Sequence, residues 1–190
     1  GSKLILGEHG GSYGVYDILF HDYFENKISD IRLNWGNDKN DNIKNKSVGI
    51  IRPLPILEKK SEKKFLTLII PTVPLYSNQF ESHIPMIHNN NFIFNPCFKI
   101  IDHLNDNIKN NDLIIRFIPR NFGLNEYEVF EKKYPKIKKD LQKISYENIL
   151  SNTKIFLSPY LGTGFLETLS MNIPTIIINS KYNENIINNH

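Results

Sequence analysis

The chain of 190 residues lacks several features that would assign it quickly to a class of protein. Its single cysteine, Cys97, cannot form an internal disulfide, which fits a reducing compartment. Because no histidine partner for this thiol is evident, we interpret Cys97 as a small, buried apolar residue. No run approaches the ~20 apolar residues of a membrane span, and no signal peptide is recognisable. These absences predict a cytoplasmic location.

Motifs of several enzyme classes are missing as well. The chain has neither a Walker A sequence nor a Gly-x-Gly-x-x-Gly fingerprint, which argues against ATPases and dehydrogenases. The histidines lack metal-ligand spacing with an acid cluster, so we expect no metal site. Four of them are interpreted as surface or packing residues: His21, His83, His88 and His103. The net charge of +3 comes from lysines spread among Asn and Asp, and no nucleic-acid partner is expected because such proteins usually cluster their cations.

What is present is an alternation of short apolar runs with helical patterns. Strands are expected at 65–70, 112–118, 154–157 and 175–178, and helices at 96–104, 126–134, 146–151 and 165–171, with a further piece near 80–87. Continuous apolar runs are typical of parallel strands that are buried on both faces. The alternation implies right-handed βαβ crossovers. We therefore predict an α/β fold with a doubly wound, Rossmann-like parallel sheet at 62–190.

Residues 1–61 are interpreted as the end of a preceding domain and a linker. Strands are expected at 3–6, 30–35 and 47–51, a helix at 15–28, and a polar loop at 37–46. Gly1 and Ser2 are typical of residues left by cloning, and the last residues are polar without a complete closing helix. We expect both domains to be truncated and the chain by itself to be inactive.

A glycine turn follows the predicted strand at 154–157. Gly162, Thr163 and Gly164 stand where a helix begins, and free backbone N–H groups there suit a phosphate. The helix dipole adds ~0.3–1 kcal/mol. The alternative is a purely structural βα turn, which also favours Gly and a Thr cap. Glu167 is a candidate acceptor for ribose hydroxyls, and the alternatives are a solvated first-turn acid or a partner for the cap.

Two arginines and a threonine are further candidates at the same sheet edge, where ligands of such sheets bind. Arg120 lies just beyond the predicted strand at 112–118, and a guanidinium suits a phosphate or carboxylate. Arg116 lies inside that strand, so its charge needs a ligand or an acid such as Asp140. Thr72 follows the strand at 65–70.

The segment Gly7-Glu-His-Gly-Gly-Ser-Tyr-Gly14 contains a second glycine turn. A histidine has no structural purpose in such a turn, so His9 is a candidate general base or phosphate ligand. Gly10, Gly11 and Tyr13 are expected to bind substrate beside it.

Four segments together resemble a family of transferases from bacterial O-antigen and surface-carbohydrate loci, of the Leptospira type. They are residues 7–14, 29–36, 115–123 and 156–177, the last reading Phe-Leu-Ser-Pro-Tyr-Leu-Gly-Thr-Gly-Phe-Leu-Glu-Thr-Leu-Ser-Met-Asn-Ile-Pro-Thr-Ile-Ile. The resemblance implies a GT-B glycosyltransferase, with the carboxyl-terminal domain holding a nucleotide-sugar and His9 on the acceptor side. Such enzymes need no metal or cofactor, because Arg, Lys and helix N-termini stabilise the departing phosphate. Arg120-Asn and 179–182 depart from the family pattern, so donor specificity is expected to differ.

The expected partners are a CMP-, CDP-, UDP- or GDP-linked sugar and a carbohydrate acceptor, with peripheral association to the inner membrane through the missing acceptor-side part. Two alternatives stay open. One is a CDP-polyol phosphotransferase of the teichoic-acid type, which shares the two-domain plan and a His-Gly turn. The other is a degenerate, non-catalytic binding module.

Overall fold

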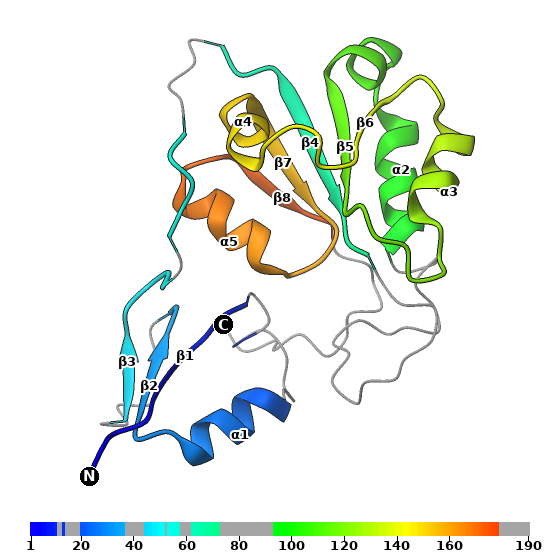
Figure 1. Cartoon of the computed structure of the whole chain (residues 1–190). Helices are drawn as coiled ribbons and strands as arrows, with labels where there is room; N and C mark the ends of the chain where they lie inside the picture. The colour runs from blue at the N-terminus through cyan, green and yellow to red at the C-terminus, as the bar shows by residue number, and fades with distance from the viewer. Residues whose placement is uncertain are drawn as a thin grey trace.

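The structure, a computed structural model, contains two parallel sheets with their helices (Figure 1). It describes residues 1–10, 13, 20–36, 44–51, 53–57, 62–72 and 93–178. The helix expected near 80–87, the first part of the helix expected over 15–28, and Gly11 lie outside these residues. The α/β class and the Rossmann-like, doubly wound arrangement are confirmed.

The smaller sheet has three parallel strands in the order β1-β2-β3. Its elements are β1 (Ile5–Gly7), α1 (Phe20–Ile28), β2 (Ile31–Asn34) and β3 (Asn45–Ser47). The strand predicted over 47–51 is wrong, because pairing ends at Ser47 and Gly49 has a φ of +70°, outside the extended region. Asn45 and Lys46, predicted within a polar loop, pair with β2 instead. They form an edge strand, which needs no apolar side chains for its backbone pairing.

The larger sheet has five parallel strands in the order β6-β5-β4-β7-β8. Its strands are β4 (Phe65–Ile70), β5 (Leu113–Phe117), β6 (Lys138–Asp140), β7 (Thr153–Ser158) and β8 (Thr175–Ile177). Its helices are α2 (Asn95–His103), a π-helical turn (Ile108–Asp112), α3 (Glu126–Lys133), α4 (Tyr146–Ser151) and α5 (Thr163–Ser170). The four predicted strands and the four main predicted helices are confirmed. The chain runs outward from β4 to β6 and returns on the other side of β4, so the switch point lies between β4 and β7.

The edge strand β6 is an element that the sequence analysis does not predict. Its residues are Lys138, Lys139 and Asp140, and none of them is apolar. The Lys139 ammonium donates to the carbonyl oxygens of Tyr134 (2.6 Å) and Ile137 (3.0 Å), and Asp140 pairs with Arg116 in the neighbouring strand. Polar contacts therefore take the place of the apolar pattern by which strands are recognised.

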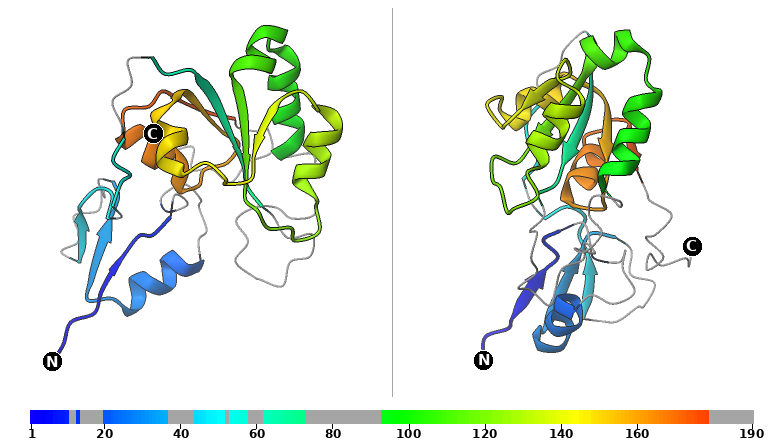
Figure 2. Two further views of the ribbon diagram at one scale, coloured as in Figure 1. Left: turned by 45° about the horizontal axis from the view of Figure 1, so that its top comes forward. Right: turned by 90° about the vertical axis from the view of Figure 1, so that its right-hand side faces the viewer.

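Helices cover both faces of the larger sheet, with α2 and α3 on one side and α4 and α5 on the other (Figures 1 and 2). On the first side, Phe94 and Phe130 meet edge to face with ring centroids 5.6 Å apart, and Ile101 and Ile115 are fully buried beside them. Cys97 is a free, fully buried thiol in this core, as predicted, and burial raises its pKa to about 12. The thiol is therefore a packing residue.

The buried face of α5 is only partly apolar. Phe165 is buried, but Leu169 is 53% exposed. Thr168 is fully buried instead and shares a 2.8 Å hydrogen bond with Thr175 of β8. A threonine pair thus joins the helix to the sheet, which an apolar pattern does not reveal.

The carboxyl ends of the strands in the two sheets point toward each other. In Figure 1, β1 and β2 run upward toward α5, whereas β4, β5 and β7 run downward toward the smaller sheet. Residue Leu57, in the segment between the sheets, packs against the α4 side of the larger one, beside Leu150, Phe156 and Ile173. The carboxyl ends of the strands in the two sheets therefore face the same region of the molecule.

Candidate functional site at facing sheet edges

A pocket of about 230 Å³ opens at the carboxyl ends of β4 and β5. Two of the predicted site residues, Thr72 and Arg120, line it. Besides Asn121, its other walls are apolar or come from the first turn of α3, and they include Phe117, Tyr127 and Glu128. The aromatic rings of Phe117 and Tyr127 meet edge to face, 5.5 Å apart. The exposed cation Arg120 and these aromatic rings thus line the same pocket.

The glycine turn after β7 leads into α5 as predicted. Gly162 is the cap residue, so the first N–H groups of the helix receive no hydrogen bond from a cap side chain. A β-carbon on Gly162 would come within 2.1 Å of the Tyr160 ring, whereas one on Gly164 would make an ordinary 3.5 Å contact with Phe156. Only Gly162 is therefore required by packing. Arg120 follows β5 and this turn follows β7, with β4 between them.

Arg116 lies behind the pocket rather than in it. Its guanidinium forms an ion pair with Asp140 and donates to the carbonyl oxygen of Ile144 (2.8 Å), with side-chain exposures of 8% for Arg116 and 3% for Asp140. Asp140 also accepts from the backbone N–H groups of Lys143 (2.9 Å) and Ile144 (3.2 Å). Asp140, which the sequence analysis named as the alternative to a ligand, is thus the partner of Arg116.

Glu167 is buried, so it is not the solvated first-turn acid that was one alternative. Its carboxylate accepts a 3.0 Å hydrogen bond from the hydroxyl of Tyr146. The guanidinium of Arg116 lies over the same tyrosine ring, 5.8 Å from its centroid. Burial, and then the charge of Glu167, raise the pKa of Tyr160 in the turn before α5. Tyr146 therefore contacts both Arg116 and Glu167.

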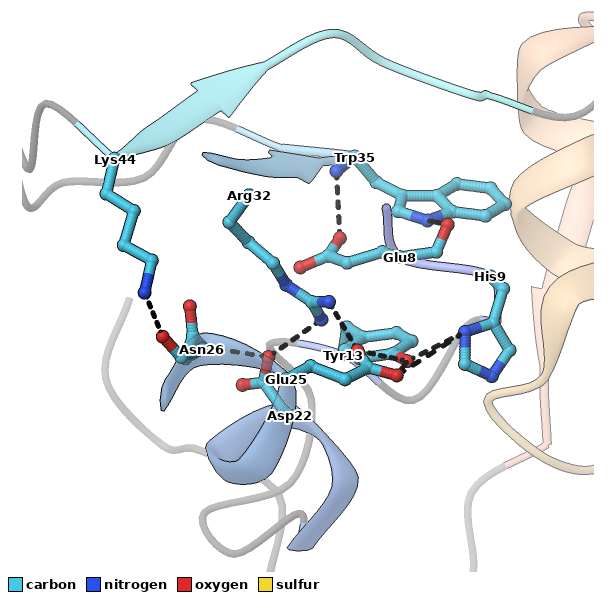
Figure 3. A network of polar contacts seen from close by, with 9 residues as sticks. All are labelled: Glu8, His9, Tyr13, Asp22, Glu25, Asn26, Arg32, Trp35 and Lys44. Atoms are coloured by element: carbon cyan, nitrogen blue, oxygen red, sulfur yellow. Dashed lines mark hydrogen bonds and ion pairs between the residues drawn. The ribbon is translucent and has the colours of Figure 1, made fainter. Parts of the chain in front are cut away.

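His9 follows β1 and takes part in a polar network of the smaller sheet (Figure 3). Its Nδ1 atom lies 2.9 Å from the hydroxyl of Tyr13, and that hydroxyl lies 3.0 Å from Oε2 of Glu25. Glu25 also receives a hydrogen bond from Arg32, whose second terminal nitrogen donates to Asp22 at 3.1 Å. The Tyr13 hydroxyl, expected at the substrate, is thus directed at His9 and Glu25.

Two charged members of this network, Glu25 and Arg32, are not predicted by the sequence analysis. Arg32 is 1% exposed although it lies in a strand of the smaller sheet. A charged residue at such a position needs a partner, which is the same signal that drew attention to Arg116. Glu25 on α1 carries no comparable signal, because helix surfaces are normally rich in acids. His21 packs its ring 4.9 Å from that of Tyr13, which agrees with its interpretation as a packing residue.

The end of β1 is fixed by a second set of contacts in the same sheet. The Glu8 carboxylate accepts from the backbone N–H of Trp35 (2.8 Å), and the Trp35 indole donates to the Glu8 carbonyl oxygen (2.9 Å). The Glu8 N–H donates to Leu33 (3.0 Å). The side chain, the carbonyl oxygen and the N–H of Glu8 are thus all hydrogen-bonded, which fixes the residue immediately before His9.

The two glycine turns found in the sequence meet in the structure. A β-carbon built on Gly10 would lie 3.8 Å from the Thr163 hydroxyl at the start of α5. His9 therefore lies one residue from the point where the smaller sheet approaches the helix N-terminus of the larger one. Figure 3 shows it at the edge of the polar network that faces the pale orange ribbon.

The described part of the chain contains neither a metal-binding cluster nor a membrane-spanning helix. Within it, no group of three or more His, Cys, Asp or Glu side chains could hold a metal ion. None of the helices it contains has the length and apolar character that crossing a membrane requires.

The fold and these residues define a Rossmann-like α/β protein whose polar candidates lie at facing carboxyl edges of two parallel sheets. The profile of a family described as LIC12162 family transferase matches residues 1–189, and the chain belongs to this family of transferases. No curated protein and no solved structure matches the chain.

Proposed function

We propose that the chain is part of a GT-B-type glycosyltransferase that uses a nucleotide-activated sugar to build a bacterial surface polysaccharide such as O-antigen. The observation that carries the proposal is the approach of Gly10 to Thr163, which places a histidine turn from one parallel sheet beside a helix N-terminus from another. A transferase needs such a juxtaposition, because donor and acceptor must be held together between their binding surfaces.

The donor is assigned to the larger sheet. Its phosphates would lie at the first turn of α5, where free N–H groups and the helix dipole favour negative charge. The pocket lined by Thr72 and Arg120 would take the rest of the nucleotide, with the Arg120 guanidinium on an oxygen atom of phosphate. The first turn of α5 follows β7, beside the switch point between β4 and β7, and switch points of doubly wound sheets are the usual place for such ligands.

The reaction assigned to the site is displacement at the anomeric carbon of the sugar. The acceptor hydroxyl oxygen forms a bond to that carbon, and the bond from the carbon to the donor phosphate breaks. The leaving phosphate keeps the electron pair and is stabilised by the α5 N-terminus and Arg120. The acceptor's proton passes to the imidazole of His9, which is 72% exposed and available to a substrate.

The test is a thermal-unfolding titration of this chain with CMP, CDP, UDP, GDP and dTDP. A nucleotide at about 100 times its Kd adds ~2.7 kcal/mol to the free energy of unfolding. We expect one nucleotide to stabilise the chain selectively. We expect Arg120→Ala to lower the affinity about tenfold or more, because a charge-assisted hydrogen bond to phosphate is lost.

Lys132→Ala is the matched control, since it removes one exposed positive charge from α3 outside the pocket and should leave the affinity unchanged. Response to CDP together with turnover of CDP-glycerol or CDP-ribitol, and none of sugar nucleotides, would identify a polyol phosphotransferase instead. A folded chain that responds to none of the five nucleotides, alone or with the rest of the enzyme, would indicate a degenerate binding module.

A further inference from the structure

Arg32 anchors the network that surrounds His9. Its side chain is 2% exposed, while those of its two acidic partners, Glu25 and Asp22, are 18% and 34% exposed. Burial acts to lower the pKa of Arg32, but the hydrogen bonds to Glu25 and Tyr13 outweigh it and raise that pKa. The guanidinium also lies over the Tyr13 ring, 5.0 Å from its centroid. A permanent buried cation thus forms an ion pair with Glu25 and packs over the Tyr13 ring.

The single proton of the Tyr13 hydroxyl has two possible acceptors. These are the carboxylate of Glu25, at 3.0 and 3.3 Å, and Nδ1 of His9, at 2.9 Å. Burial, with the hydrogen bond and charge of Glu25, raises the pKa of Tyr13 above the ordinary tyrosine value, so the hydroxyl keeps its proton. An ionised carboxylate accepts only and forms the stronger, charge-assisted bond. The proton therefore goes to Glu25, and the tyrosine oxygen is left as an acceptor toward His9.

A short contact between that oxygen and Nδ1 then requires the proton to be on the histidine nitrogen. We propose that Tyr13, held by Glu25 and Arg32, is a positioning residue that fixes His9 as the Nδ1–H tautomer and leaves Nε2 as the base. Figure 3 shows the second ring nitrogen pointing away from Tyr13 and Glu25. Orientation of a histidine through one nitrogen so that the other can take a proton is a general device of catalytic sites.

The use of Nε2 as a catalytic base rests on the proposed function. The tautomer itself does not, because it is a property of the chain without ligand. The other titratable and charged groups that face His9 are few among the described residues. They are Glu25, whose Oε1 lies 3.9 Å from Nδ1, and His21, whose ring centroid lies 6.0 Å away. Neither provides Nδ1 with the close acceptor that the tyrosine oxygen does.

The experiment is a long-range ¹H–¹⁵N spectrum of the ¹⁵N-histidine-labelled chain at about pH 8.5, where an ordinary imidazole with a pKa of ~6.5 is neutral. A free neutral imidazole prefers the Nε2–H form. We expect the native chain to show His9 with a protonated Nδ1 and an unprotonated Nε2. In Tyr13→Phe, which keeps the ring but removes the hydroxyl, the pattern should revert to the Nε2–H form.

Tyr23→Phe removes a hydroxyl from an exposed tyrosine of α1 and serves as the control, with no change expected at His9. The proposal is overturned if native His9 is the Nε2–H form, or if its ring pattern is the same in Tyr13→Phe. The spectra need no ligand, so a failure of nucleotide binding leaves this result standing, and the reverse also holds. If Tyr13→Phe is poorly folded, the native tautomer alone still decides between the two arrangements.

Discussion

Asp140→Ala is expected to cost about 3–5 kcal/mol of the free energy of unfolding, because it leaves the charge of Arg116 buried without its acidic partner. It also removes the oxygen that accepts from the Lys143 and Ile144 N–H groups. A typical domain has only ~5–15 kcal/mol in total, so the variant should be close to unfolding at ordinary temperature. Urea denaturation of the variant and the native chain measures the difference.

Two further variants separate the charge from the hydrogen bonds in this prediction. Asp140→Asn keeps an oxygen for the two backbone N–H groups but loses the charge, so most of the loss should persist. Replacing both partners, as Arg116→Met with Asp140→Ala, should recover a large part of the stability because no unpaired charge remains. A loss below about 1 kcal/mol in Asp140→Ala would show that Arg116 is solvated, and would return it to the list of ligand-binding candidates.

Gly162→Ala is expected to weaken nucleotide binding at least tenfold and to cost about 1–3 kcal/mol of stability. The added carbon would lie 2.1 Å from the Tyr160 ring, so the ring or the turn must move at the point where the phosphate is proposed to bind. Gly164→Ala is the matched comparison two residues along. Its added carbon meets Phe156 at 3.5 Å, and alanine is favoured over glycine inside a helix by roughly 0.5–1 kcal/mol.

We therefore expect Gly164→Ala to bind nucleotide like the native chain and to be equally or slightly more stable. Nucleotide titration followed by thermal unfolding measures both quantities on the same samples. Equal loss of binding in the two variants would mean that both glycines serve close approach of the phosphate. Unchanged binding in both would place the phosphate away from this turn.

The regular part of the fold could be predicted because its strands are apolar runs, and the central ones are largely buried. β4 coincides with the continuous run Phe65–Ile70, and α4 with the pattern at Tyr146–Ser151. The edge strands β3 and β6 escaped prediction because their side chains are polar. Both are held by backbone pairing, and β6 is also held by ion pairs.

For the candidate site, the sequence predicts single residues but not the contacts between them. His9 and Thr163 could be selected individually, since a histidine in a glycine turn and a glycine turn before a helix are local signals. Their proximity, inferred from Gly10 and Thr163, depends on how two separate sheets pack, and no local pattern records it. The role of Glu25 is likewise tertiary, because it follows from Arg32 being buried beneath α1.

The most direct test of the proposed donor site is an amide ¹H–¹⁵N map of this 22.2 kDa chain with the nucleotide selected by the titration. The account predicts that the largest shifts fall at Gly162, Thr163 and Gly164, with a second group at Thr72 and Arg120. Shifts confined to other parts of the chain, or none at saturating nucleotide, would contradict the assignment of the larger sheet as the donor site.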